Sequence, residues 1–257
     1  MIRQPGRYLK QNWATPAAVL TFLLLLWIGS LTLPRFIFPT VGEILSSVVT
    51  IVTTLYEPLF ITLGRYVVAL AAAVVAGWSI GLLMGAFRQY FGRYMRQVTA
   101  IIQAIPALSW VLLAVLWIEN IELRIFFTTF LIAFPFFVIA VYEGIRDMDK
   151  DLLEAIDQFR PNRWQVLRIL LVPQSFVTLI MTLRSTAAMT LKLLVFFELI
   201  GASNGVGQQF SKAQATYQVD MILGWTIILV IINFIILRII DLAEKRILRW
   251  RTEAVVR

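Results

Sequence analysis

Two residue types are absent from this chain of 257 residues, which contains no cysteine and no histidine. The absence of cysteine excludes disulfide bonds and thiolate metal sites, and the absence of histidine removes the commonest metal ligand and general base. Charged residues are scarce at 15%, whereas 60% of the residues are hydrophobic and the mean hydropathy is +0.81. Because a soluble domain is seldom this apolar, the composition predicts one polytopic membrane unit.

The sequence signatures of ATP binding and of catalysis are also missing. No G-x-x-x-x-G-K-[ST] loop occurs, so the chain cannot bind ATP by that route. The segment GASNGVG at 201–207 has glycines but no lysine, and we interpret it as a flexible outer loop. We therefore expect no catalytic residue, no metal site and no cofactor. Energy for any transport must come from a partner or from an ion gradient.

Long apolar runs are what the chain does contain. A helix needs about 20 apolar residues to cross about 30 Å of hydrocarbon. Six runs are interpreted as spans, at 17–33, 59–87, 98–118, 123–142, 174–200 and 221–240. The second run is rich in alanine and glycine, which suits close contact between helices in lipid. Residues 39–55 are amphipathic, and we expect them to lie at the interface or pack on the bundle, with re-entry into the membrane as the alternative.

The basic residues are distributed unevenly among the loops that these spans define. Under six spans, 17 of the 23 lysines and arginines fall on one side. Positive residues mark the cytosolic side, so both termini and the charged segment after the fourth span are predicted to be cytosolic. The net charge of +8 reflects these loops and does not indicate nucleic-acid binding. The first dozen residues are basic but no small-residue cleavage site follows, which favours a retained helix over a signal peptide.

The longest charged stretch between apolar runs covers residues 151–173. Apolar residues recur at helical spacing from Leu152 to Phe159, and Pro161 then breaks the pattern. A second amphipathic segment contains Trp164, and Pro173 sits where a membrane helix would start. The pattern predicts two short helices around a turn. Such a knob on one side of a membrane is suited to docking a soluble partner.

This knob carries a family resemblance. Glu154-Ala155-Ile156, closed by Val172-Pro173, resembles the cytosolic coupling loop of ABC importer permeases, whose pattern is Glu-Ala-Ala, three residues, Gly and, about ten residues on, a Leu-Pro or similar pair. Further matches, in the family's order, are Thr62-Leu63-Gly64-Arg65, Gly81-Leu82-Leu83-Met84-Gly85, Ile105-Pro106, Leu108-Ser109-Trp110, Leu116-Trp117 and Glu198-Leu199-Ile200-Gly201-Ala202-Ser203 with Gly205 and Gly207. Together they resemble the nitrate/sulfonate/taurine branch, which includes transporters of vitamins and their precursors.

Two departures from the family pattern affect what the resemblance implies. Arg160 stands where the family usually has glycine, and arginine accepts a left-handed turn less readily. We expect Pro161 and Asn162 to form the turn by a different route, which keeps the knob and alters its geometry. The third span ends Trp117-Ile118-Glu119 instead of Trp-Phe-Gly, so nothing is inferred about its outer end.

The resemblance implies an all-α polytopic fold: one permease domain over 1–257, with a peripheral helix at 17–33, core helices within 59–240 and a coupling loop at 146–173. It implies a prokaryotic inner-membrane location and no enzymatic activity, because a separate ATPase supplies the energy. The implied partners are an ATP-binding subunit dimer, a second permease copy (identical or paralogous), an extracytoplasmic solute-binding protein and the lipid membrane, and no nucleic acid. The implied coupling residues are Glu154, Ala155, Ile156, Phe159, Arg160, Trp164 and Pro173.

For the solute, the resemblance leaves several classes. We expect a vitamin or precursor, riboflavin- or thiamine-pyrimidine-like, with an alkylsulfonate, taurine or nitrate as the alternative. A stand-alone secondary transporter or channel is the alternative class. A secondary transporter would ordinarily show buried acidic residues or inverted repeats, and the spans offer only Glu198, near an outer end.

Charged residues within the spans have both structural and functional interpretations. We expect Arg65, at the start of its span, to snorkel to the outer interface. Arg184 and Lys192 are eight residues apart, about 80° on a helical wheel. A charge in the bilayer core costs about 2.5–3.5 kcal/mol, so neither should face lipid. Each either pairs with carbonyls or a neighbouring acid, which we favour for Arg184, or lines the pathway, which stays open for Lys192. With Glu198 they are the candidate pathway residues.

Overall fold

The computed structural model describes residues 17, 21, 24, 27–29, 34, 38–148, 158–160 and 162–248, and all regular structure within them is helical. The predicted all-α fold is confirmed. The chain divides into two compact units, residues 1–56 with 210–228 and residues 57–209 with 229–257.

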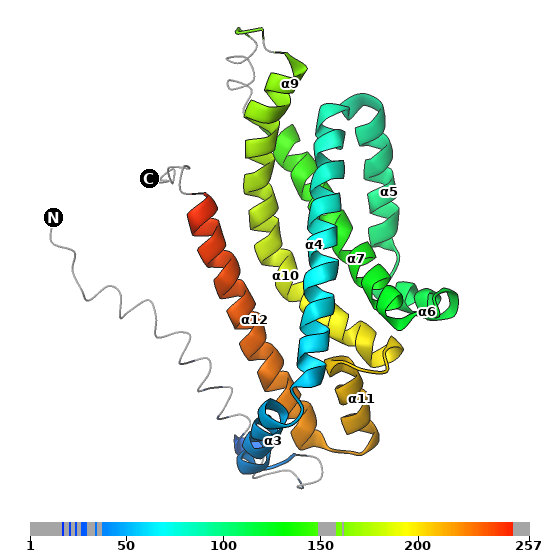
Figure 1. Cartoon of the computed structure of the whole chain (residues 1–257), viewed down its shortest axis with the longest axis vertical. Coiled ribbons are helices and arrows are strands. Elements are labelled where there is room, and N and C mark those ends of the chain that lie inside the picture. Colours follow the sequence, from blue (N-terminus) through cyan, green and yellow to red (C-terminus); the bar gives the residue numbers. More distant parts are fainter. Residues whose placement is uncertain are drawn as a thin grey trace, which may run out of the picture. The chain divides into compact units, whose positions relative to one another are not determined.

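The larger unit is built around three long helices that lie side by side (Figure 1). They are α4 (Glu57–Ala86), α7 (Ile121–Arg146) and α10 (Val172–Gly201). The other helices of this unit are η1 (Arg88–Gly92), α5 (Arg93–Ala104), α6 (Ala107–Trp117), α9 (Arg163–Gln165) and η2 (Val166–Leu171), together with the end of α12 (Val219–Ile247) and the start of α11 (Val206–Ala215). Buried apolar side chains from α4, α7 and α10, such as Tyr66, Phe137 and Leu194, form its core.

Helices α4 and α7 run parallel and pack closely along a row of glycines. A Cβ added at Gly77, Gly81 or Gly85 would fall 2.5, 2.7 or 2.8 Å from a side-chain atom of α7, in Phe137, Val141 and Ile145 respectively. No side chain fits at such distances. The small residues predicted to give close helix contact in this span therefore do so.

Four of the predicted spans correspond to long apolar helices. They are α4, α7, the continuous segment Val166–Gly201 and α12, each long and apolar enough to cross a membrane. The helix that contains residues 174–200 begins earlier than predicted, because η2 continues into α10 without a break. The predicted span at 17–33 lies largely outside the described residues.

The predicted span at 98–118 is sharply bent in the structure. Helices α5 and α6 meet there at 88°, so this part is a broken span or a re-entrant loop. The break falls at Ile105, whose backbone is extended (φ −77°, ψ 126°), immediately before Pro106. A proline disfavours helical backbone in the residue before it, which explains the position of the bend.

The smaller unit contains α3 (Val41–Thr53), which confirms an amphipathic helix within residues 39–55. Thr40 and Glu43 form a capping box at its start. At 13 residues it is about 20 Å long, too short to cross a bilayer. Its buried face includes Ser47, whose hydroxyl donates a hydrogen bond to Asp220 Oδ2 at 2.6 Å.

Candidate functional site

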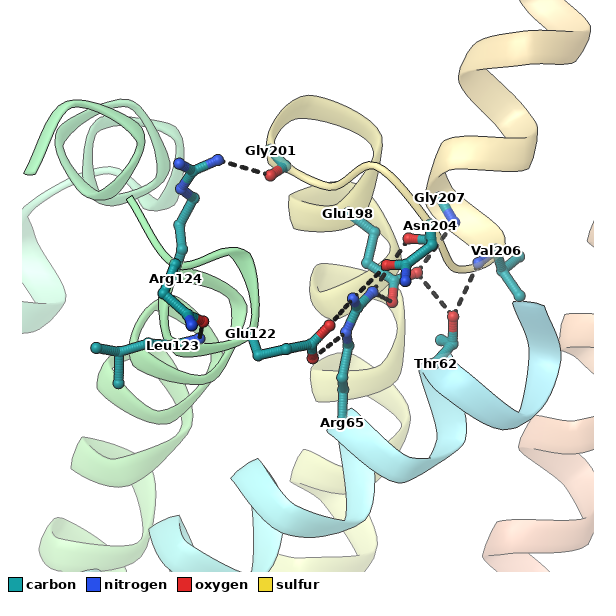
Figure 2. A network of polar contacts seen from close by, with 11 residues as sticks. Thr62, Arg65, Glu122, Leu123, Arg124, Glu198, Gly201, Asn204, Val206 and Gly207 are labelled. Atoms are coloured by element: carbon teal, nitrogen blue, oxygen red, sulfur yellow. Dashed lines mark hydrogen bonds and ion pairs between the residues drawn. The ribbon is translucent and has the colours of Figure 1, made fainter. Parts of the chain in front are cut away.

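Arg65 of α4 holds together three segments at one end of the larger unit (Figure 2). Its Nε donates to Glu122 Oε2 at 2.8 Å, and Nη1 donates to Glu198 Oε1 at 2.7 Å and to the Asn204 carbonyl at 3.1 Å. Nη2 donates to Glu122 Oε1 and to Asn204 Oδ1. A guanidinium has five N–H donors, and all five are used. The buried side chain of Arg65 thus joins α4 to α7, to α10 and to the segment that follows α10.

The expectation that Arg65 snorkels to the interface is wrong. The residue is only 8% exposed, and its charge is met by two carboxylates. Burying a guanidinium is costly unless it is paired and fully hydrogen-bonded, and this pairing supplies both conditions. With no donor left over, Arg65 has nothing to offer an anionic solute.

Glu198 of α10 is fully buried and completes the cluster. Its Oε2 accepts hydrogen bonds from Thr62 Oγ1 at 2.7 Å and from the Gly207 backbone N–H at 3.0 Å. Thr62 in turn accepts from the Val206 N–H at 2.8 Å. We refer to Thr62, Arg65, Glu122, Glu198, Asn204, Val206 and Gly207 as the Arg65 cluster. The Glu198 carboxylate therefore holds the start of α11 in place through the Gly207 N–H. Its hydrogen-bond partners are all groups of the protein, so it is engaged in structure.

The interpretation of residues 201–207 as a flexible loop is also wrong. Gly205, Val206 and Gly207 are buried, and Gly205 has φ +96°, a conformation that side-chain-bearing residues rarely adopt. A Cβ at Gly205 would fall within 2.7 Å of all three carboxylate atoms of Glu198. The glycines therefore let the backbone approach the carboxylate closely, which fixes the segment in place.

The sequence offered only partial signals for this cluster. The stretches Thr62–Arg65 and Glu198–Gly207 were matched to the family pattern, but nothing in them indicated that they meet. Glu122 gave no signal beyond being an acid at the start of a span.

An open cavity of about 740 Å³ adjoins the cluster and is lined by Arg65, Glu122 and Asn204 together with apolar side chains of α4 and α7.

Arg184 has the acidic partners that the structural interpretation requires. Its Nε lies 3.1 Å from Asp241 Oδ1, and Nη1 lies 3.9 Å from Glu244 Oε2, both on α12. The side chain is 57% exposed. The ion pairs favour a structural role in joining α10 to α12.

Lys192 differs from Arg184. It is exposed on α10, between the buried residues Leu191 and Leu194, and it has no hydrogen bond or ion pair with any of the described residues. It lies about 13 Å along the axis from the helix end at Gly201. A cation this deep in a span requires water, an acid or a polar cavity beyond this chain's own described surface.

The coupling segment is described only in part. Glu154, Ala155 and Ile156 lie outside the described residues, whereas Phe159 and Trp164 are 84% and 73% exposed. Arg160 has φ 47°, so it adopts the left-handed conformation that a glycine would take there. Arginine thus takes up the left-handed backbone that it accepts less readily than glycine, and Pro161, expected to form the turn with Asn162, lies outside the described residues. Phe159 and Trp164 thus leave apolar surface exposed on the described part of this segment.

Pro173 lies in the first turn of α10, as predicted for a helix start, although the helix continues on its N-terminal side as η2. In η2 the N–H of Val172 bonds to the carbonyl of Leu167, five residues back. Proline cannot donate in a regular α-helical ladder, and a π-helical turn accommodates the missing donor without breaking the rod. The described part of the coupling segment from Arg163 onward is therefore continuous with the membrane span.

The described residues form a helical protein with several helices long and apolar enough to cross a membrane, one of which continues without a break from α9 and η2. Residues 77–249, more than half of the chain, match the family described as the binding-protein-dependent transport system inner membrane component. The chain belongs to this family of ABC importer permeases. Permeases of this family are not themselves enzymes, and the family implies a separate ATPase subunit and a solute-binding protein.

Similar proteins cover nearly the whole chain. The taurine transport system permease protein TauC of Escherichia coli is 25% identical over 96% of both chains. The putative aliphatic sulfonates transport permease protein SsuC of Bacillus subtilis is 24% identical over 97% of this chain and 91% of that protein. A chain of the inward-facing MetNI methionine ABC transporter superposes with a TM-score of 0.65 at 19% identity, covering 77% of this chain and 96% of that chain. That likeness supports the fold.

Proposed function

We propose that this chain forms the pathway of an ABC importer for a small organic sulfonate, such as taurine or an alkylsulfonate. The observation that carries the proposal is the end-to-end similarity to permeases named for taurine and aliphatic sulfonates. The expected vitamin or vitamin precursor is not supported by these relatives. Nitrate is the other anion among the alternatives, and the uptake experiment described below distinguishes it from a sulfonate.

An anionic solute suits the exposed cation on α10. Lys192 has no partner among the described residues, so its ammonium is available to a passing anion if this face of α10 lines the route. Arg184 is engaged by Asp241 and Glu244, and Glu198 is engaged within the Arg65 cluster. Of the three candidate pathway residues, Lys192 is therefore the one we assign to the pathway.

The assembly in this proposal contains two permease copies, identical or paralogous, over an ATP-binding subunit dimer. Each chain is one permease domain with both termini cytosolic, and an extracytoplasmic binding protein delivers the solute. An ATPase dimer offers two docking grooves, and each permease presents one knob. Two permeases related by twofold symmetry are therefore the simplest arrangement. Movement of the knob passes directly to α10 because no break separates η2 from α10. The permeases then alternate between inward and outward openings by rigid-body movement.

The solute is tested by uptake in proteoliposomes that contain the full importer with its binding protein. ATP-dependent uptake of labelled taurine or an alkylsulfonate, with no uptake of riboflavin or a thiamine precursor, is expected. Uptake of nitrate alone, or of a vitamin alone, would overturn the sulfonate assignment and leave the family unchanged.

Lys192→Met tests the pathway residue, because it removes the charge and keeps the length of the side chain. We expect sulfonate uptake at least tenfold slower, since the cation no longer offsets the cost of moving an anion through a low-dielectric region. The complex should still assemble, and the binding protein should still stimulate its ATPase. Lys192→Arg should keep most of the uptake, and Lys212→Met, which removes an exposed cation from α11, should have no effect. Normal uptake by Lys192→Met would remove Lys192 from the pathway, and loss of the assembled complex would assign it a structural role.

A further inference from the structure

At the opposite end of the larger unit from the Arg65 cluster, three arginines converge on a small cavity. It measures about 290 Å³ and is lined by Arg88, Gln89, Arg93, Arg96 and Tyr142. This size lies at the lower limit for small-ligand pockets, which suits a single phosphate-bearing group better than a whole organic molecule. Within the larger unit, the walls come from η1, α5 and the last turns of α7.

One of these arginines is held in place by the ends of two helices. Arg88 Nη2 donates to the Ile145 carbonyl of α7 at 2.8 Å, and Nε donates to the Gly85 carbonyl of α4 at 3.2 Å. These carbonyls belong to C-terminal turns, where unpaired acceptors attract cations. Arg88 is thus fixed, and its Nη1 has no protein acceptor in the described part of the chain.

The other two arginines are exposed and unpaired. Arg93 and Arg96 are one turn apart on the same side of α5, and neither has a hydrogen bond or ion pair with a described residue. The nearby acids do not neutralise the cavity. Asp147 is occupied by Arg146, whose hydrogen bonds lower the pKa of that carboxyl, and Glu143 is the other carboxylate on the last turn of α7. The described lining of the cavity thus contains three arginines and no carboxylate, which leaves positive charge for an anion.

Exposed aromatic residues place this cavity at the level of lipid headgroups. Phe87, Tyr90 and Tyr94, which adjoin its lining residues in sequence, are 59%, 86% and 67% exposed, and Leu83, one turn further into the span, is exposed as well. Aromatic side chains with an apolar body and a polar tip concentrate at the membrane–water interface. A cavity that opens only to water would gain nothing from exposed aromatic side chains beside it. The surroundings therefore favour a lipid over a soluble anion.

We propose that Arg88, Arg93 and Arg96 bind the headgroup phosphate of an anionic phospholipid. Basic pockets between membrane helices on the cytoplasmic side are suited to this, because each arginine near an anionic surface strengthens binding about fivefold. The bound lipid ties the turn between α4 and α5 to the end of α7. The cavity shares no lining residue with the candidate pathway residues, so this proposal does not depend on which solute is carried.

The test uses the full chain purified from nanodiscs of equimolar phosphatidylglycerol and phosphatidylcholine, with retained lipids counted by native mass spectrometry. The wild-type protein is expected to retain phosphatidylglycerol preferentially. Arg93→Gln with Arg96→Gln should reduce that preference about 25-fold, from two residues at about fivefold each. Arg93→Lys with Arg96→Lys should keep it, because the charges remain. The matched control, Lys245→Gln with Arg246→Gln, removes two exposed cations from α12 and should leave the preference unchanged.

Three results would overturn the proposal. Equal retention of phosphatidylglycerol by the glutamine variant and the wild type would show that the arginines do not hold the lipid. Displacement of the lipid by millimolar inorganic phosphate would assign the cavity to a soluble phosphate. Unchanged lipid retention with loss of the co-purifying ATP-binding subunit would assign these arginines to a protein contact.

Discussion

The five N–H groups of Arg65 meet five acceptors, contributed by three residues from different parts of the chain. Such saturation makes the side chain a structural tie and removes it from solute chemistry. The carboxylate of Glu198 depends on Thr62 and the Gly207 N–H as well as on Arg65. At this scale the cluster behaves as a unit, because the loss of any one partner leaves a buried polar group unpaired.

Thr62→Val is the most selective test of this cluster, since valine has nearly the shape of threonine but no hydroxyl. Glu198 loses a donor and the Val206 N–H loses its acceptor. We expect the free energy of unfolding to fall by about 1–3 kcal/mol, which lowers the Tm of the purified protein by several degrees. Thr62→Ser keeps the hydroxyl and is the control. Equal Tm values for the valine and serine variants would show that the hydroxyl contributes nothing.

The glycine row on α4 governs packing at the scale of whole helices. Gly81→Ala should disrupt the contact with α7, because the added Cβ would lie 2.7 Å from side-chain atoms of Val141. We expect a loss of about 1–3 kcal/mol from overpacking, or failure to accumulate in the membrane. Gly64→Ala on the same helix is the matched control, since nothing lies within 4 Å of its added Cβ. Equal thermal stability of the two variants would contradict the close packing.

The coupling segment is the second element whose role can be tested directly. Glu154→Lys reverses a charge at the position that resembles the family's docking motif, and we expect it to abolish ATP-dependent uptake while membrane insertion continues. Phe159→Ala should weaken uptake less, because it removes an exposed apolar side chain but no charge. Transport and co-purification of the ATP-binding subunit are measured together. Normal uptake by Glu154→Lys with the subunit still bound would exclude a coupling role.

At the scale of the whole molecule, the directions of the helices agree with the uneven distribution of basic residues between the two sides of the membrane. Helices α4 and α7 are parallel, so the basic residues at or just after their C-terminal ends, such as Arg146 and Arg88, lie at the same end of the larger unit. Arg65, Glu122 and Glu198 meet at the other end, as the antiparallel direction of α10 requires. Since positive loops face the cytosol, the Arg88 end is predicted to be cytosolic.

Accessible tags test this orientation. A tag at residue 90 and tags at both termini should react with impermeant reagents only from the cytosol, and a tag near Lys212 only from outside. The measurement compares labelling in right-side-out and inverted vesicles. A cytosolic tag at Lys212 would contradict the alternation of the helices after the knob.

The sequence by itself determined the class of fold, four of the membrane helices and the family, because apolar runs and ordered short motifs are local properties of the chain. It also identified the glycines of α4 as a packing surface. Only the tertiary structure showed that Thr62, Arg65, Glu122 and Glu198 form one cluster, since residues 57 to 136 positions apart meet through helix packing. It likewise separated Arg184, which has partners on α12, from Lys192, which has none among the described residues. A charge in a span looks the same in sequence whether it is paired or exposed, because its free energy depends on the neighbours that folding brings to it.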